Sequence, residues 1–387
     1  MRPGQSGVLR ACAYVGLPLL LLLAAAPGAA ARQSAAPTPL GSEWPLDARH
    51  FDASRIWRLS QGAGVTVAVV DTGVNARHPD LAGRVLPGTD VTGQAADGRV
   101  DVSSESHGTS VAGVIAGSGG TGGTGGTGKG MAGLAPRATL LPVRVSGNEA
   151  ADPLALARGI VYAADHGAAV INISMVTTDP DPQIRDAVAY ARSHDVIVVA
   201  AAGNSGRAGN PVTYPAAFPG VVAVSGTTRD GGFWAAGESG SYIALAAPAV
   251  DIYSTRNSGG YLTKDGTSYS APYVSAAAAL LRAAYPSESA GQIIARLIGT
   301  ADLPGGGSGR DDRFGYGIVD PLKALGAPAP ASSANPLLTA SGDGAPKAAD
   351  AAGGTSGGTV AVIGAVAGVT AAGAGGFLVR RRSRRRT

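Results

Sequence analysis

Apolar, strand-like runs alternate with helix-like stretches through the middle of the chain, and this alternation limits the folds that the sequence can adopt. Strands are predicted at 65–71, 139–145, 168–174, 196–203 and 221–226. Each is an almost continuous run of Val, Ile and Ala, as expected of parallel strands that are buried on both faces. Helices are predicted at 153–167 and 182–195. The sequence therefore predicts a doubly wound α/β domain with a mostly parallel sheet, with its functional residues at the carboxyl ends of the strands.

The first 31 residues have the pattern of a secretory signal peptide. Arg2 and Arg10 precede an apolar run that ends in small residues, so cleavage is expected near Ala31. An uncleaved N-terminal anchor is the alternative. The single cysteine, Cys12, lies in this segment, so the mature chain is expected to form no disulfide. Residues 32–60 would then be a short N-terminal extension before the α/β domain at 61–326.

The C-terminal region predicts a membrane anchor. Residues 327–358 are rich in Pro, Ala, Ser and Gly, which is typical of a disordered linker. Residues 359–379 carry no charge and are followed by the basic segment 380–387, as in a membrane-spanning helix with a short cytoplasmic tail. A cell-wall sorting signal is the alternative, but no LPxTG-type motif precedes the apolar run. The expected location is the cell membrane, with one span and an extracytoplasmic domain.

The basic residues do not indicate a nucleic-acid partner. Eight arginines lie at the two chain ends, and removing them turns the formal net charge of +4 into −4. The glycine-rich run 117–130 also lacks the phosphate-binding pattern, because Lys129 is followed by Gly130 rather than by Ser or Thr. We interpret this run as a surface insertion and expect no nucleotide cofactor.

An aspartate and a histidine are the first two candidate catalytic residues. Asp71 ends that strand in the sequence VVDTGV. Asp-Thr-Gly also occurs in aspartic proteases, but their mechanism needs a second such motif, which is absent here. Asp71 is therefore either a turn residue or the partner of a different group. His107 is a candidate for that group, because it begins the helix-like run HGTSVAGVIAG.

The stretch DGTSYSAP, residues 265–272, supplies a candidate nucleophile. Ser268 follows a Gly-Thr turn and would open a helix, whereas Ser270 would be rotated by about 200° around that helix. Both serines cannot face one site, and Ser268 is the better placed. Asn204 follows the strand at 196–203, where its amide could stabilise an oxyanion together with the Ser268 N–H.

These motifs resemble those of the subtilisin-like serine proteases. The matching stretches are GVTVAVVDTGV, HGTSVAGVIAG, VINIS, AAAGNSG, GTSYSAP and GYGIVD, and the chain order Asp, His, Ser is the subtilisin order. The resemblance implies that Ser268 attacks a peptide carbonyl, that His107 transfers the proton and that Asp71 orients His107. It implies Asn204 as an oxyanion donor, a protein or peptide substrate and no cofactor.

The complete layout is similar to that of the mycosins, which are membrane-anchored subtilases of type VII secretion. This resemblance implies membrane components of such a system as partners. A structural subunit with secondary proteolysis is the alternative function, although the complete catalytic set argues against a pure scaffold. The spacing of Gly364 and Gly368 could form a helix-packing surface, or it could arise by chance in a Gly/Ala-rich span.

Two departures from the family pattern carry further expectations. The substrate-binding strand reads Ser174-Met175-Val176 instead of Ser-Leu-Gly, so a side chain at 176 is expected to narrow the pocket and favour small residues such as Ala. The loop that holds calcium in many secreted subtilases is here the Gly/Thr run, which is poor in carboxylates and side-chain amides. We expect no tight metal site there.

Overall fold

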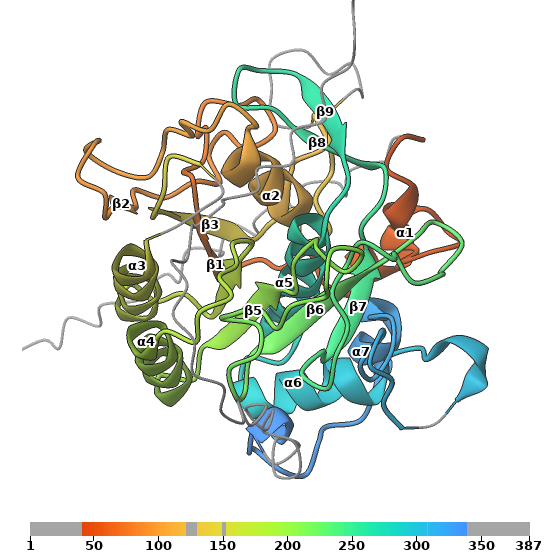
Figure 1. The fold of residues 1–387 in the computed structure, drawn as a ribbon. Coiled ribbons are helices and arrows are strands. Elements are labelled where there is room, and N and C mark those ends of the chain that lie inside the picture. Colours follow the sequence, from red (N-terminus) through yellow and green to blue (C-terminus); the bar gives the residue numbers. More distant parts are fainter. Residues whose placement is uncertain (1–40, 121–129, 149–151, 308, 339–387) are drawn as a thin grey trace, which may run out of the picture. The chain divides into compact units, whose positions relative to one another are not determined.

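The computed structural model describes residues 41–120, 130–148, 152–307 and 309–338 (Figure 1). The predicted signal peptide, the membrane span at 359–379, the basic tail and the linker beyond residue 338 lie outside the described residues. Within the described ranges, no helix is both long and apolar enough to cross a membrane.

Seven parallel strands form the central sheet, in the order β2-β3-β1-β4-β5-β6-β7 (Figure 1). The predicted strands correspond to β1, β3, β4, β5 and β6, and the predicted parallel α/β sheet is confirmed. The short edge strands β2 and β7 and an antiparallel hairpin of β8 and β9 were not predicted. The strand bounds are β1 Thr66–Asp71, β2 Thr89–Asp90, β3 Thr139–Arg144, β4 Val170–Ile173, β5 Ile197–Ala201, β6 Val222–Thr227, β7 Leu245–Pro248, β8 Ile252–Thr255 and β9 Tyr261–Lys264.

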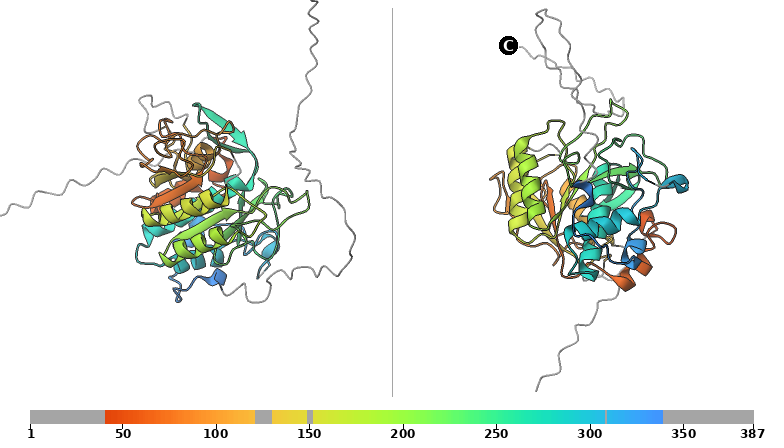
Figure 2. Two further views of the ribbon diagram at one scale, coloured as in Figure 1. Left: turned by 60° about the vertical axis from the view of Figure 1, so that its left-hand side comes forward. Right: turned by 90° about the horizontal axis from the view of Figure 1, so that it is seen from below.

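Helices cover both faces of this sheet. The helices α3 (Pro153–Asp165) and α4 (Pro182–Ser193) pack side by side on one face, here called the α3 side (Figure 2). The helices α2 (His107–Ala116) and α5 (Thr267–Ala284) pack on the other, the α5 side. Successive side chains of a strand alternate between these two cores, as strand geometry requires. The alternation explains why the strands are apolar at nearly every position.

The N-terminal extension is part of the domain rather than a separate segment. Its described part contains a short 3₁₀ turn, η1 (Trp44–Leu46), and helix α1 (Ala53–Leu59), which pack into the α5-side core. The indole N–H of Trp57 donates to the carbonyl of Leu134 at 2.9 Å. Burying three large aromatic rings near the N-terminus gives this segment several kcal/mol of apolar stabilisation, on the order of 2 kcal/mol for each ring.

The domain also continues past residue 326, where composition predicts a linker. Helices α6 (Ala290–Gly299) and α7 (Pro321–Gly326) follow α5, with a 3₁₀ turn, η2 (Pro304–Gly306), between them. Residues 327–338 then run along α6 to a last turn, η3 (Pro336–Leu338). Side chains tie this segment down: Gln292 donates to the Pro330 carbonyl and Asn335 to the Gly220 carbonyl, both at 2.9 Å.

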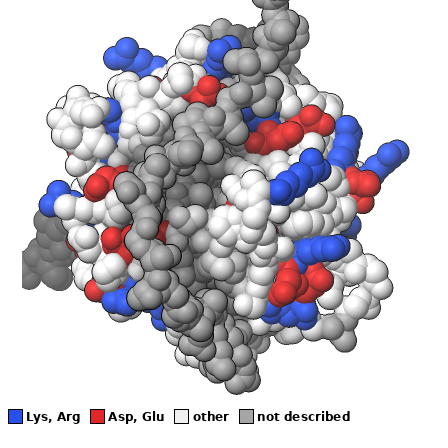
Figure 3. Space-filling view, in the orientation of Figure 1, with Lys and Arg blue, Asp and Glu red and all other residues white. Residues whose placement is uncertain are grey.

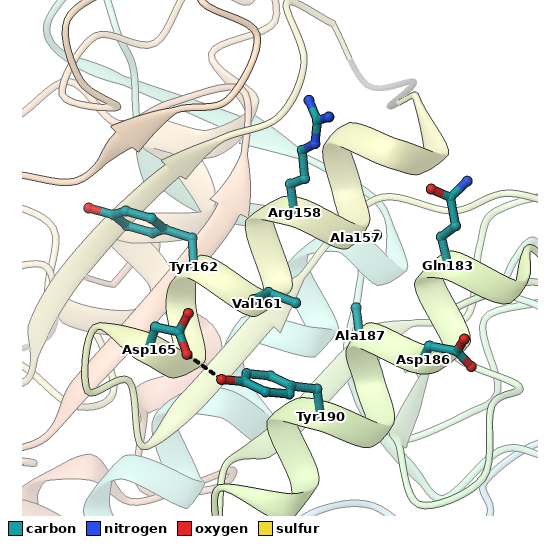
Figure 4. Close-up of a pocket in the computed structure, with 9 residues that line it drawn as sticks. All are labelled: Ala157, Arg158, Val161, Tyr162, Asp165, Gln183, Asp186, Ala187 and Tyr190. Atoms are coloured by element: carbon teal, nitrogen blue, oxygen red, sulfur yellow. Dashed lines mark hydrogen bonds between the residues drawn. The ribbon is translucent and has the colours of Figure 1, made fainter.

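The described surface carries charges of both signs. Figure 3 shows basic and acidic side chains close to one another on one face of the molecule. A groove lies between α3 and α4, and the Tyr190 hydroxyl donates to Asp165 across it at 2.7 Å (Figure 4). Because α3 and α4 cover the α3 side, this groove lies in the helix layer opposite to the one that carries the predicted nucleophile.

Candidate active site

Strand alternation directs Asp71 toward the predicted nucleophile. Val67 and Val69 point into the α5-side core, whereas Ala68 and Val70 point into the other core. Asp71 continues the first set, so its side chain projects toward α2 and α5. Since β1 lies between β3 and β4, the carboxyl end of β1 is at the position where the order of strands reverses, which is where open α/β sheets place their sites.

His107 and Asp71 form a buried hydrogen bond. His107 is the first residue of α2, and its Nδ1 lies 2.8 Å from Asp71 Oδ1. Asp71 is fully buried and His107 is 4% exposed. This approach requires glycine at 108, because a Cβ there would lie 2.1 Å from the Gly73 carbonyl oxygen. The HG pair therefore lets the start of α2 press against the end of β1.

The first turn of α2 is capped by residues outside the helix. Ser106 precedes it in a left-handed conformation and makes no side-chain cap. Instead, the Gly108 N–H donates to Thr72 Oγ1 at 3.0 Å, and the Thr109 N–H donates to Asp101 Oδ2 at 2.9 Å. Burial raises the pKa of the Asp101 carboxyl, against the hydrogen bonds that lower it. Thr72 also lies 2.9 Å from Asp101, so one polar network joins the end of β1 to the start of α2.

Ser268 is the second residue of α5 and is 9% exposed. Its N–H is one of the first-turn donors that the helix's own carbonyls do not satisfy. Pro272, the sixth residue, has no N–H to bond the Ser268 carbonyl, which instead accepts from Ser174 Oγ at 3.0 Å. The ring of His107 lies 6.4 Å from that of Tyr269, because α2 packs against α5.

Ser270 is directed elsewhere, as its rotation around the helix predicts. Its hydroxyl donates to the carbonyls of Ala247 and Pro248, at 3.0 and 3.1 Å, and its side chain is fully buried. Of the two serines in this stretch, Ser268 alone lies beside the end of β4, with its hydroxyl 3.2 Å from the Ser174 carbonyl.

Asn204 is held by its amide oxygen. Asn204 follows β5, and its Oδ1 accepts from the Thr267 N–H at 2.9 Å and from the Thr267 hydroxyl at 3.0 Å. An N–H donor requires an acceptor opposite it, so this contact assigns the orientation of the amide. The other end of the amide group is therefore the Nδ2 donor. It lies 3.4 Å from the position that a Cβ on Gly266 would occupy.

Comparison with known proteins identifies the family of this chain. The family model described as "Subtilase family" matches residues 62–317. The chain belongs to the subtilase family. Thermitase from Thermoactinomyces vulgaris is 37% identical over 276 residues, which cover 71% of this chain and 93% of thermitase. Mycosin-4 from Mycobacterium tuberculosis is 36% identical over 322 residues, covering 71% and 67% of the two chains.

Solved structures show the same relationship. The structure of the MycP3 protease from the type VII (ESX-3) secretion system matches this subtilase with a TM-score of 0.62 and 33% identity. The match covers 76% of this chain and 89% of the MycP3 chain. The protein is thus a subtilisin-like serine endopeptidase related to the mycosins, as the motifs predicted.

The three predicted substrate-binding residues of this subtilase have different surroundings. Ser174 projects toward α5 and bonds the Ser268 carbonyl, and Met175 projects into the α3-side core, where it is 2% exposed. Val176 is 39% exposed. The next residue, Thr177, pairs with Tyr214 through two backbone hydrogen bonds of 2.9 and 2.8 Å. Val176 is therefore the member of the three whose side chain is exposed to solvent.

The described residues contain no group of three or more His, Cys, Asp or Glu side chains arranged to hold a metal ion. Most of the Gly/Thr run lies outside these residues, so the expectation about its metal binding stays a prediction. Asp80 joins the two flanks of that run to β9. It accepts from the N–H groups of Gly120 and Met131 at 2.7 and 2.9 Å, and from the Tyr261 hydroxyl at 2.8 Å.

Three residues that hold the site were not predicted from sequence. Thr72 and Asp101 join β1 to α2, and Thr267 fixes Asn204 beside Ser268. Thr72 and Thr267 each lie next to a predicted residue, so the motifs DTG and GTS already contain them. Asp101 has no such signal, since the two threonines that connect it to the site lie at the end of β1 and in α2.

We expect Asp101→Asn to destabilise the subtilase and to slow catalysis. Asp101 accepts four hydrogen bonds, from the N–H groups of Ser103 and Thr109 and from two threonine hydroxyls. In asparagine an NH₂ group replaces one of the two carboxylate oxygens. This NH₂ group cannot accept, so it would face N–H and hydroxyl donors without forming a hydrogen bond to them. The free energy of unfolding should fall by about 1–3 kcal/mol, and kcat should fall several-fold. Urea unfolding and peptide hydrolysis measure the two effects.

Asp97→Asn is the matched control, because Asp97 lies in the same loop and pairs with the partly exposed Arg99. Its effect on the free energy of unfolding should stay within about 0.5 kcal/mol. If Asp101→Asn behaved like this control in both measurements, the capping network would have no role in holding the site.

Proposed function

We propose that Ser268, His107 and Asp71 are the catalytic triad of this subtilase, with Asn204 and the Ser268 N–H as oxyanion donors. The observation that carries the proposal is the buried 2.8 Å hydrogen bond between His107 and Asp71. It joins the end of β1 to the start of α2, in the helix layer that presents Ser268. Each of these residues occupies the motif position that carries this role in the family.

The geometry supports a division of roles. The Asp71 carboxylate accepts from His107 Nδ1–H, which leaves Nε2 unprotonated and able to act as a base. Ser268 Oγ then bonds to the peptide carbonyl carbon as its proton moves to Nε2. That proton passes to the leaving amine when the C–N bond breaks. Water repeats the sequence on the acyl-enzyme, releasing the acid and restoring Ser268.

The oxyanion would form between two fixed donors. The Ser268 N–H lies at the start of α5, where the helix dipole favours negative charge. Asn204 Nδ2 would supply the second donor, since Thr267 holds the other end of the amide. Both donors are positioned before substrate binds, and each is worth about 10²–10³ in rate.

The first test is covalent labelling of the full chain, purified in detergent, with a fluorophosphonate. Intact mass should show one adduct on the parent and none on Ser268→Ala. Ser270→Ala is the matched control, because the Ser270 hydroxyl bonds to carbonyls of the core. It should be labelled like the parent. A folded parent without an adduct would contradict an activated Ser268.

We further propose that the pocket before the scissile bond selects small residues through Val176. A peptide with Ala at that position should be cleaved at least about tenfold better, in kcat/KM, than one with Phe. Val176→Gly should reduce this preference by removing the exposed side chain. Leu154→Ala, at an equally exposed position on α3, should leave the preference unchanged. Equal cleavage of both peptides by the parent would contradict the proposal.

We also infer that this subtilase is anchored in the cell membrane as a mycosin of a type VII secretion system. The uncharged segment 359–379 and the arginines after it support this, together with the similarity to Mycosin-4 and MycP3. Alkaline extraction should release a chain ending at residue 338 and leave the full chain in the membrane. Equal release of both chains would contradict anchoring. Replacing residues 359–379 with an unrelated membrane span tests the alternative function as a structural subunit. Loss of a membrane complex with unchanged peptide cleavage would support that structural role.

A further inference from the structure

Glu238 is a fully buried carboxyl group that the proposed mechanism does not use. It lies in the segment between β6 and β7, and its Oε1 accepts from the Ser205 N–H at 2.8 Å. Its Oε2 is buried without a hydrogen-bond partner among the described residues. Burial raises its pKa to about 7. Burying a carboxyl group costs free energy of folding when the group is charged. We therefore ask what the hydrogen bond that it accepts from the Ser205 N–H does for the structure.

The carboxyl group of Glu238 packs against the peptide that precedes Asn204. Gly203 has a φ of +107°, and a Cβ there would lie 2.7–2.8 Å from the Glu238 carboxyl atoms. The Glu238 N–H points at the Gly203 carbonyl at 3.4 Å. Gly203 and Ser205 flank Asn204, so Glu238 contacts the chain on both sides of the proposed oxyanion donor.

Thr267 holds the same turn from the opposite direction. The Gly203 N–H donates to Thr267 Oγ1 at 3.0 Å, and Thr267 bonds the Asn204 amide oxygen. The turn is therefore clamped between Thr267, which adjoins Ser268, and Glu238. Thr267 fixes the orientation of the Asn204 side chain, whereas Glu238 fixes the backbone that carries it.

We propose that Glu238 is a positioning residue for the oxyanion site: by accepting the Ser205 N–H and packing on Gly203, it keeps Asn204 Nδ2 in place beside Ser268. This inference rests on the proposed role of Asn204. Electrostatic stabilisation of a transition state depends on donors held at hydrogen-bonding distance. A small shift of the Asn204 backbone would therefore cost rate without removing any group that touches the substrate.

A double-mutant cycle on the full chain tests the proposal. Glu238→Ala should lower kcat about tenfold and leave KM within about twofold, when rates are divided by the sites titrated with a fluorophosphonate. In an Asn204→Ala background the same change should lower kcat by less than about twofold, because the donor that it positions is gone. Glu238→Gln keeps an acceptor for Ser205 and should retain kcat within about threefold of the parent.

Glu288→Gln is the matched control. Glu288 is also a buried carboxylate, 8% exposed, but it pairs with Arg296 beyond the far end of α5. It should lower the melting temperature without changing kcat per titrated site. A lower melting temperature with unchanged kcat in Glu288→Gln would show that general destabilisation alone does not reduce kcat. A lower kcat in Glu238→Ala would then have to come from the position of Asn204.

The outcomes distinguish the two proposals. If Asn204→Ala alone leaves kcat unchanged, the oxyanion assignment fails and the inference about Glu238 fails with it. If Asn204→Ala lowers kcat but Glu238→Ala lowers it equally in both backgrounds, the inference about Glu238 alone is overturned. An unchanged kcat in Glu238→Ala would overturn it as well.

The pH dependence of stability gives a second measurement. Because the pKa of Glu238 is higher in the folded state than its ordinary 4.5, protonation stabilises the fold, and this contribution is lost as pH rises through about 7. Tyr242 faces it from the same segment, but its pKa is raised to about 12, so it stays neutral in this range. The Gly203–Gly206 turn and Ser225 of β6 carry no titratable group.

The melting temperature of the parent should therefore fall more between pH 5 and pH 8 than that of Glu238→Gln, which cannot ionise at this position. Identical pH dependence in the two proteins would contradict the burial of the Glu238 carboxyl group against Gly203, on which the inference depends.

Discussion

Burial of the parallel sheet on both faces is the constraint on which the rest of this structure depends. Each strand must place apolar side chains alternately into two helix-covered cores, so a polar residue at a strand's carboxyl end takes its direction from the strand before it. Asp71 follows Val67 and Val69, and Ser174 follows Val170 and Asn172. All of these project to the α5 side. The alternation that stabilises the sheet thus also directs the site residues toward one helix layer.

The two helices that carry His107 and Ser268 begin without a cap of their own. Some of their first-turn N–H groups donate to other segments. At α2 the acceptors are Thr72 and Asp101, and at α5 the Thr267 N–H donates to Asn204. Each cap is also a tie between a helix start and a strand end. Because these ties are hydrogen bonds between buried or partly buried groups, they hold the donors and the base that the proposed chemistry needs in defined positions.

Strong local patterns made much of the fold predictable. The Val/Ile/Ala runs located β1, β3, β4, β5 and β6, and rotation around a helix separated Ser268 from Ser270. Segments with weak local patterns could not be predicted in this way. The edge strand β2 has two residues, and the Pro/Ala-rich residues 327–338 are ordered by side chains of α6 and by Gly220 rather than by their own composition. Met175 occupies a family motif position, yet alternation turns its side chain into the opposite core.

By itself, the sequence determined the fold class, the residues of the proposed triad and the family, because each depends on a periodicity or a short motif. Only the tertiary structure decided which groups hold those residues. Asp101 and Glu238 stand in loops with no distinctive motif, and each accepts from a backbone N–H of another segment. The separation along the chain is 8 residues for Asp101 and 33 residues for Glu238. The physical reason is that a hydrogen bond between segments depends on where the chain returns in space. The local preferences of neighbouring residues do not determine where a distant segment of the chain will lie.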